Sequence, residues 1–409
     1  MLIEFKFRNF LSYKDETTIS LAPVESFKEL KKTNSTKTKR EELNLLKSIA
    51  VFGSNGGGKS NLINALGFLD GMVHNSFADS LKKEEDKIER DYFFKLSTLT
   101  ENKPSMFEVT FLLEDVIYRY GFEINRNTIV SEWLYKKLEK ETMLFERTGT
   151  DFNINKSGFK EGLKRKNEVN HNVLFLSLLA QYNGTLSSQI FHWFKCFNVV
   201  SGLHDNHYNK ITKHLIKNDP NFQLWLSRAL RFLEITDVSL NKEDDNELLV
   251  FHSKYDENNL YRESIPMLLE KEESQGTRKL IYLLGALYDT LTHGKVLCID
   301  EFDNKLHPNL TIKLLKFFHE YNLKGAQFIF TAHDSILLDK IVFRRDQIWF
   351  VDRNQFGASE IYPMSDFDSK VVRNTSDFRK KYLESIFGAA ETINITDQLI
   401  ELMYADGKE

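Results

Sequence analysis

A glycine-rich stretch near the start of the chain constrains its fold more than any other feature. Residues 53–60 read Gly-Ser-Asn-Gly-Gly-Gly-Lys-Ser, the spacing of a phosphate-binding loop. The apolar run 49–52 before it predicts a buried strand, and residues 61–69 place apolar side chains at helical spacing after it. A strand, a glycine loop and a helix in this order suit an anion site. The alternative interpretation is a glycine-rich turn between two ordinary elements.

The residues of this loop have distinct expected roles. The glycines allow positive φ angles, so that several N–H groups and the positive end of the following helix can face an anion. Lys59 is expected to reach the β- and γ-phosphates of ATP, and the Ser60 hydroxyl to bind Mg²⁺. The residues expected to bind the nucleotide are Gly53, Ser54, Asn55, Gly56, Gly57, Gly58, Lys59, Ser60 and Asn61.

Two later strand ends are predicted to complete the site. Residues 295–302 are apolar and end in Asp300, expected to hold Mg²⁺, and Glu301, expected to orient and deprotonate the attacking water. Residues 326–334 predict another buried strand, which leads to His333. Because parallel strands present their carboxyl ends at one edge, His333 is expected near the γ-phosphate. The alternative for His333 is a core histidine.

A third segment, 273–287, begins a predicted helix. Ser274 is placed as its N-cap, and apolar residues recur at helical spacing from Leu280 to Leu287. A helix start with hydroxyl residues and a glycine can bind phosphate, although an ordinary capped helix explains the same pattern.

Size and composition narrow the class of protein. The chain has 409 residues, 41% of them hydrophobic, and a net charge of -4. This length suggests two or three domains, and the charge leaves nucleic-acid binding to a local patch at most. The Lys-rich piece 28–40 is either such an arm or a solvated loop. Two cysteines and no apolar run of 18 residues favour a cytoplasmic protein without a membrane span.

The remaining pattern predicts how the chain is divided. Residues 2–7 and 17–22 read as strands, 106–113, 116–124 and 128–137 as an antiparallel meander, and 159–234 as mainly helical. We expect an ATPase core with a largely parallel sheet, an antiparallel β lobe and a helical insertion. The expected domains are 1–158, 159–270 (mainly helical) and 271–409.

The order of these motifs resembles the ABC and SMC type of ATPase. The resemblance implies that Ser274, Gly276 and Thr277 form a signature touching ATP bound by another subunit, that Asp303 belongs to the loop linking two sites, and that His333 is the switch histidine. It also implies a homodimer or a higher homo-oligomer with nucleotides held between subunits. The family usually senses the nucleotide with a glutamine after the first lobe, yet no Gln occurs between Lys59 and Gln181.

Segments 7–16, 300–308, 331–338 and 345–351 narrow the likeness, because they look like the compact OLD-like ATPases (the AAA-15 and AAA-21 grouping). Members often serve bacterial phage defence, in abortive-infection, PARIS-type or Septu-type systems. Full OLD nucleases carry a nuclease domain after the switch histidine, for which the residues after His333 leave little room. We therefore expect an ATPase that controls a separate effector, a nuclease or a toxin. The alternatives are a DNA-binding repair or chromosome-maintenance ATPase of the RecF or SMC type, and a scaffold that binds ATP and barely hydrolyses it.

Overall fold

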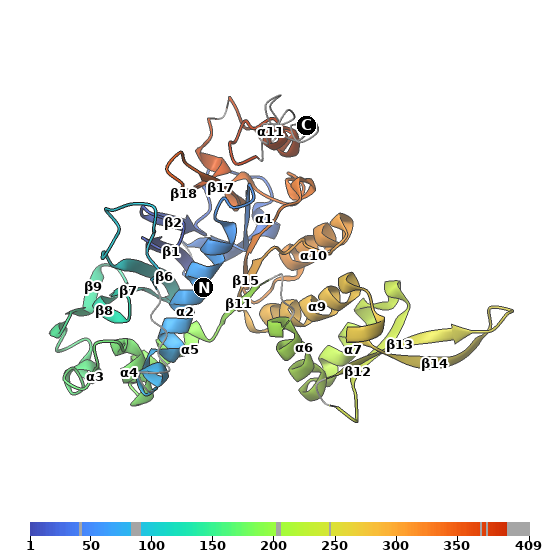
Figure 1. Ribbon diagram of the computed structural model, residues 1–409, viewed down its shortest axis with the longest axis horizontal. Helices are drawn as coiled ribbons and strands as arrows, with labels where there is room; N and C mark the ends of the chain where they lie inside the picture. Colours follow the sequence, from blue (N-terminus) through green and yellow to red (C-terminus); the bar gives the residue numbers. More distant parts are fainter. Residues whose placement is uncertain are drawn as a thin grey trace, which may run out of the picture.

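The computed structural model describes residues 1–40, 43–82, 91–201, 206–244, 247–368, 370–373 and 375–390. It confirms the expected α/β class, since a largely parallel six-stranded sheet lies beside a seven-stranded antiparallel sheet, with helices around both (Figure 1). The short strands β3 (Ser35–Lys37) and β4 (Asn44–Leu46) form a separate pair.

The six-stranded sheet carries the phosphate loop. Its neighbours pair in parallel except for the antiparallel edge strand β18. In spatial order its strands are β11 (Phe197–Ser201), β15 (Val296–Asp300), β16 (Gln327–Thr331), β5 (Ser48–Gly53), β17 (Ile348–Arg353) and β18 (Ser359–Pro363). Because β16 and β17 flank β5, the loop after β5 emerges between the carboxyl ends of two neighbouring strands.

Both faces of this sheet are covered, which explains the uninterrupted apolar run in β5. All six residues of β5 are buried. Ile49 and Val51 belong to one apolar core, and Ala50 and Phe52 belong to the other. Strands buried on both faces are typical of parallel sheets between layers of other elements.

The seven-stranded sheet lies against the first of these cores. Its neighbours are all antiparallel, and the predicted meander is confirmed. In spatial order its strands are β10 (Asp151–Ile154), β9 (Glu141–Thr148), β8 (Thr128–Lys137), β7 (Val116–Asn125), β6 (Ser105–Leu113), β1 (Leu2–Arg8) and β2 (Thr17–Ser20). Gln327 of β16 joins the two sheets: its amide oxygen accepts from Leu2 N (2.6 Å), and its amide nitrogen donates to Leu2 O (2.8 Å).

Helices fill both sides of the six-stranded sheet. Helix α2, after the loop, packs between the two large sheets, where Phe68 meets Phe107 of β6 with ring centroids 4.8 Å apart. Helices α9 and α10 bury their apolar faces in the second core. The α-helices are α1 (Lys31–Asn34), α2 (Lys59–Ser80), α3 (Lys160–Leu163), α4 (Phe175–Gln181), α5 (Thr185–Phe194), α6 (Asn206–Asn218), α7 (Pro220–Ala229), α8 (Leu269–Glu272), α9 (Gln275–His293), α10 (Pro308–Tyr321) and α11 (Phe378–Leu383).

One sheet was not expected from the sequence. Within the segment predicted as mainly helical, the strands β12 (Ile235–Leu240), β13 (Leu248–Tyr255) and β14 (Tyr261–Leu268) pair antiparallel. Figure 1 shows β13 and β14 extending away from the rest of the molecule as a hairpin. Much of β14 is exposed, so it lacks the apolar alternation that would have revealed it.

The Lys-rich piece 28–40 is more ordered than a solvated loop. Residues 31–37 form α1 and β3, and Asn34, the last residue of α1, is 2% exposed. Its side-chain amide donates to Val342 O (2.8 Å) and Gln347 Oε1 (2.7 Å). The solvated-loop interpretation is therefore wrong for this part of the segment.

Every helix in the described ranges is too short or too polar to span a bilayer.

The last described residues return to the sheet beside the phosphate loop. Phe387 stacks on Phe350 of β17 with ring centroids 4.9 Å apart, and Ala389 N donates to Asp352 Oδ2 (3.0 Å). Ser385 and Gly388 adopt φ angles of 56° and 66°. Both residues lie in the left-handed region, where glycine has no steric penalty.

Candidate functional site

The phosphate loop occupies the turn between β5 and α2, as the sequence predicts. Gly56 and Gly58 have φ angles of 72° and 121°. An added Cβ on Gly58 would lie 2.3 Å from Ser359 Oγ and 3.0 Å from Ser12 Oγ. Gly58 therefore needs to be glycine for two reasons, its backbone conformation and the close approach of two serines.

The other two glycines of the loop lie against β17. A Cβ on Gly53 would be 2.2 Å from Val351 O, and a Cβ on Gly57 would be 3.1 Å from the same oxygen. The loop thus packs directly against the neighbouring strand, so β17 contributes to the loop's surroundings although it comes about 300 residues later.

A layer of polar side chains supports the backbone of this loop. Ser12, Tyr13 and Ser359 were not among the predicted site residues, whereas Asn61 was predicted to bind the nucleotide. Ser359 Oγ donates to Gly57 O (2.6 Å) and is 2.7 Å from Ser12 Oγ. Asn61 Nδ2 donates to Ser12 Oγ (2.8 Å). Tyr13 OH donates to Gly58 O (3.2 Å), and burial raises the pKa of Tyr13 well above its usual value, so this donor stays protonated. These residues hold the loop backbone in its curved form.

Lys59 lies at the start of α2 and folds over its own loop. Its Nζ donates to Gly53 O (2.7 Å) and to Ser54 O (3.0 Å), and the residue is 5% exposed. Ser60, next to it, is exposed, as are Asn55 and Gly56. The loop therefore holds the ammonium of Lys59 against its own backbone and leaves Ser60 exposed.

The acids at the end of β15 lie next to the end of β16. Asp300, 7% exposed, accepts from Thr331 Oγ1 (2.6 Å), and Glu301 N donates to that same oxygen (2.7 Å). Thr331 pairs in register with Val51 of β5. The strand order therefore leaves only β16 between the strand that ends at Asp300 and the strand that leads to the phosphate loop, and both strands end at the same sheet edge, as parallel topology predicts.

His333 and Asp303 join Glu301 at this edge. His333 Nε2 lies 3.5 Å from Glu301 Oε1, and Asn304 Nδ2 donates to Glu301 Oε2 (3.1 Å). Asp303 Oδ2 accepts from His333 N (2.9 Å) and Asp334 N (2.6 Å). Because Asp303 binds the backbone of the next loop, it fixes where His333 stands relative to Glu301.

The residues of the predicted signature lie at the N-terminus of α9. Ser274 is the N-cap, as predicted, and its Oγ accepts from Thr277 N (3.1 Å). Ser274 and its neighbours Gln275 and Thr277 are exposed or partly exposed. A Cβ on Gly276 would lie 2.9 Å from Lys305 O, so this glycine allows the helix start to touch the loop after Glu301.

The donors present fit Mg²⁺. The hydroxyl of Ser60 and the carboxylate of Asp300 are the oxygen ligands that this ion prefers, and Mg²⁺ is commonly bound through one or two carboxylates together with substrate phosphates.

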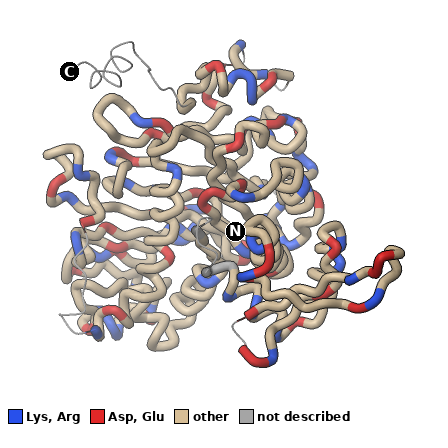
Figure 2. Tube along the Cα trace, turned by 45° about the vertical axis from the view of Figure 1, so that its right-hand side comes forward, with Lys and Arg blue, Asp and Glu red and all other residues tan. Residues whose placement is uncertain are grey.

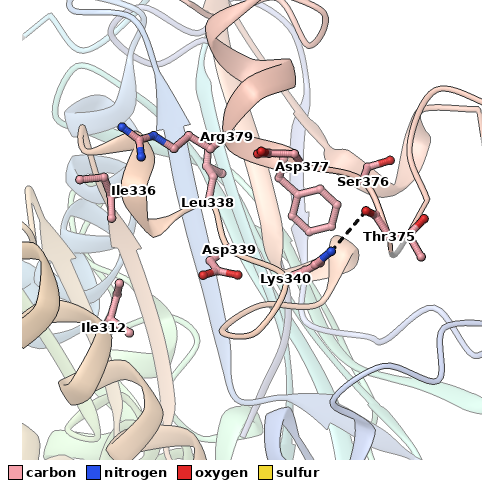
Figure 3. A pocket seen from close by; sticks show the side chains of 10 residues that line it. Ile312, Ile336, Leu338, Asp339, Lys340, Thr375, Ser376, Asp377 and Arg379 are labelled. Atoms are coloured by element: carbon pink, nitrogen blue, oxygen red, sulfur yellow. Dashed lines mark hydrogen bonds between the residues drawn. The ribbon is translucent and has the colours of Figure 1, made fainter.

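Elsewhere, a pocket of about 340 Å³ lies between α10, the turn 335–337 and α11 (Figure 3). Its lining includes Ile312, Lys340 and Arg379, and none of the residues predicted for the nucleotide site.

Comparison with known proteins adds a family and several distant structures. Residues 48–339 match a family described as "AAA domain, putative AbiEii toxin, Type IV TA system". The sequence comparison with curated proteins gave no match.

Three SMC head structures are similar over most of the chain. The head domain from Thermotoga maritima has 14% identity and a TM-score of 0.41, and the match covers 88% of this chain and 98% of that one. A head bound to the C-winged helix domain of ScpA has 14% identity and a TM-score of 0.45, and the match covers 88% of this chain and 97% of that one. A head with an extended coiled coil bound to the C-terminal domain of ScpA from Pyrococcus furiosus has 12% identity and a TM-score of 0.41, and the match covers 94% of this chain and 99% of that one.

Proposed function

The chain belongs to the AAA family of the AbiEii-type group, and from that premise we propose that it is an Mg²⁺-dependent ATPase that works as a nucleotide-sandwich homodimer or higher homo-oligomer. The observation that carries the proposal is the meeting of Glu301, His333 and Asp303 at the sheet edge that also holds the phosphate loop.

The phosphate loop would bind the triphosphate. The N–H groups of residues 54–61 and the N-terminal end of α2 attract the phosphates. Lys59, now held by Gly53 O and Ser54 O, would turn to the β- and γ-phosphates without leaving the loop. Ser60 and Asp300 would hold Mg²⁺, which supplies charge neutralisation of the phosphates.

Glu301 would act on the attacking water. Its Oε1 lies near His333 Nε2 and its Oε2 accepts from Asn304, so the carboxylate is held in one orientation. A carboxylate in this role orients the water and accepts its proton, while His333 would donate to the γ-phosphate. Phosphoryl transfer depends mainly on positioning and charge stabilisation, which is what this fixed cluster offers.

Ser274, Gly276 and Thr277 would contact ATP held by the phosphate loop of a second copy. A helix N-terminus capped by a hydroxyl residue is a suitable anion site. This exposed helix start is available to a neighbouring molecule. Such a contact makes each site incomplete without its partner.

The first test compares three variants with wild type. Lys59→Ala should lose ATP binding, whereas Glu301→Gln should bind ATP and lose about 10²–10⁴-fold in turnover. Glu301→Gln should also accumulate ATP-dependent dimers, seen by light scattering. The control, Glu320→Gln, changes an exposed carboxylate on α10 and should keep wild-type turnover. Normal turnover in both Lys59→Ala and Glu301→Gln would reject an ATPase at this site.

We further propose that ATP turnover restrains or drives a separate effector, a nuclease or a toxin, in phage defence. The support is the resemblance to OLD-like ATPases together with the AbiEii-type family. The test is phage plating on cells that express the chain with its neighbouring genes, with wild-type or Glu301→Gln sequence. Equal plaque numbers in both strains and in an empty-vector strain would reject this role.

A second candidate function is DNA binding of the RecF or SMC type, which one contact favours. Arg40 Nη1 donates to Lys137 O (3.3 Å), and Arg40 also reaches Leu138 O, so the Lys-rich piece 28–40 meets the basic end of β8. Figure 2 shows that positive and negative residues are otherwise interspersed along the chain. Filter binding with plasmid and single-stranded DNA should then show an affinity that depends strongly on salt. The double variant Arg40→Ala and Lys137→Ala should lose this DNA binding. Unchanged binding in that variant would reject this surface.

A further inference from the structure

Lys279 of α9 is a buried lysine beside the proposed catalytic residue. It lies five residues after Ser274, is 1% exposed, and its Nζ donates to Glu301 O (2.9 Å). Burying an ammonium is costly unless it is hydrogen-bonded, so a lysine at this position calls for a reason. This bond ends on the backbone of Glu301, whereas the Glu301 carboxylate has its own contacts with Asn304 and His333.

The backbone that Lys279 holds is unusual. Glu301 has a φ of 54° and Lys305 a φ of 63°, both in the left-handed region. Such a conformation costs a residue with a side chain roughly 1–2 kcal/mol and persists where its surroundings enforce it. The loop 301–305 thus has a left-handed residue at each end.

Helix α9 touches this loop at both of those residues. Lys279 binds Glu301 O, and Gly276 lies against Lys305 O, where even a Cβ would be only 2.9 Å from the oxygen. In between, Asp303 binds the backbone of His333 and Asp334. The first two turns of α9, the loop 301–305 and the His333 loop are therefore connected within one subunit by the hydrogen bonds of Lys279 and Asp303 and by the close approach of Gly276.

We propose that Lys279 is a positioning residue that ties the start of α9 to Glu301 of the same subunit. The inference rests on the proposed function. In a nucleotide sandwich, Ser274 contacts the ATP bound by the partner, whereas Glu301 acts on the ATP bound by its own subunit. Lys279 then connects the two sites: engagement of Ser274 at one nucleotide sets the orientation of Glu301 at the other.

Mixed dimers can separate this role from simple support of the signature helix. A subunit with Glu301→Gln cannot hydrolyse its own ATP, so single-turnover hydrolysis in a mixed dimer reports on Glu301 of the other subunit. Lys279→Met, which keeps the length and apolar stem of lysine, is placed either in the hydrolysing subunit or in the Glu301→Gln subunit. Two affinity tags allow each mixed dimer to be isolated.

The two placements of Lys279→Met have different predicted effects on the single-turnover rate. Lys279→Met in the hydrolysing subunit should slow the single turnover about 10- to 100-fold, as expected for a displaced catalytic group, with ATP affinity within about twofold of the control dimer. In the Glu301→Gln subunit it should leave the rate unchanged. Lys279→Arg, which keeps a positive donor, should recover part of the rate in the first placement.

Other results would overturn the inference. Slowing only when Lys279→Met lies in the Glu301→Gln subunit would mean that Lys279 only supports Ser274, which contacts the ATP of the hydrolysing subunit. Equal slowing in both placements would mean that Lys279 supports the dimer as a whole, and no slowing in either would mean that its bond to Glu301 has no effect on hydrolysis. Where Lys279→Met does not fold, judged by circular dichroism, Lys279→Gln carries the same comparison. The failure of wild-type chain alone to hydrolyse ATP would instead refute the proposed function.

Discussion

Replacing Gly58 by alanine tests the geometry of the phosphate loop in a quantitative way. Gly58 has a φ of 121°, and a Cβ there would lie 2.3 Å from Ser359 Oγ and 2.8 Å from Ser359 Cβ. The backbone conformation costs alanine about 1–3 kcal/mol. The collision adds about 1–3 kcal/mol, as is usual for overpacking. Gly58→Ala should therefore cost about 2–6 kcal/mol, a large part of a typical folding free energy.

The matched control is Gly56→Ala in the same loop. Gly56 has a φ of 72°, but nothing lies within 4 Å of an added Cβ. Only the backbone term remains, about 1–2 kcal/mol. The difference between the two variants therefore reports the contacts at Gly58, with Ser359 and Ser12, together with its more extreme φ angle; the Ser359 contact is separated by the double variant below.

Two assays are needed, because the loop can relax and transfer the cost from folding to binding. Urea denaturation gives the loss of unfolding free energy, and titration with a fluorescent ATP analogue gives the loss of affinity; the two losses together should reach the predicted range. Adding Ser359→Gly removes both colliding atoms and should give a coupling free energy of about 1–3 kcal/mol with Gly58→Ala. The reasoning is refuted if Gly58→Ala is no worse than Gly56→Ala, or if the coupling is zero.

Three further predictions concern the support of the sheet. Burial lowers the pKa of His319 from 6.5 to about 3, so the unfolded chain binds this proton more tightly than the folded chain does. The free energy of unfolding should therefore fall by roughly 1.4 kcal/mol per pH unit as the pH drops below 6.5. His319→Gln should remove this slope from denaturation curves. Gln327→Ala should cost about 2–4 kcal/mol by leaving Leu2 N and O without their buried partner, whereas Gln189→Ala at an exposed position should be neutral in the same assay. Burial raises the pKa of Cys298 far above its usual value. A thiol reagent should therefore modify Cys196 in the folded protein and Cys298 only after unfolding, as detected by mass spectrometry. Equal labelling rates would contradict the buried position of Cys298.

The parts of the fold that the sequence predicted are those encoded locally. The loop between β5 and α2, the meander of β6 to β8 and the strands that end at Asp300 and Thr331 each follow from periodicity or motif spacing within about ten residues. The N-cap at Ser274 is likewise a local pattern. Parallel topology then brought the two acids and His333 to one edge, because that edge is common to all carboxyl ends.

The parts that were missed depend on contacts between distant segments. Ser12 and Ser359 meet beside Gly58 although 347 residues separate them. Ser12 lies in the segment 7–16 that carries the family resemblance, but nothing in that segment indicates a contact with Ser359. The exposed strand β14 has no apolar face to signal it. The bond of Lys279 to Glu301 O spans 22 residues and joins two separate motifs; a lysine within a helix otherwise predicts a solvated side chain.

The central claim is that the ATP bound by one copy is completed by Ser274 of another, and subunit mixing tests it most directly. Lys59→Ala leaves a subunit with an intact signature, and Ser274→Arg leaves a subunit with an intact phosphate loop. Each variant alone should have no ATPase activity. Mixing the two creates dimers in which one site combines both intact halves, so ATPase activity should return and rise with the concentration of the second variant. Activity that stays absent at every mixing ratio, or a Ser274→Arg subunit that hydrolyses ATP alone, would contradict the shared site.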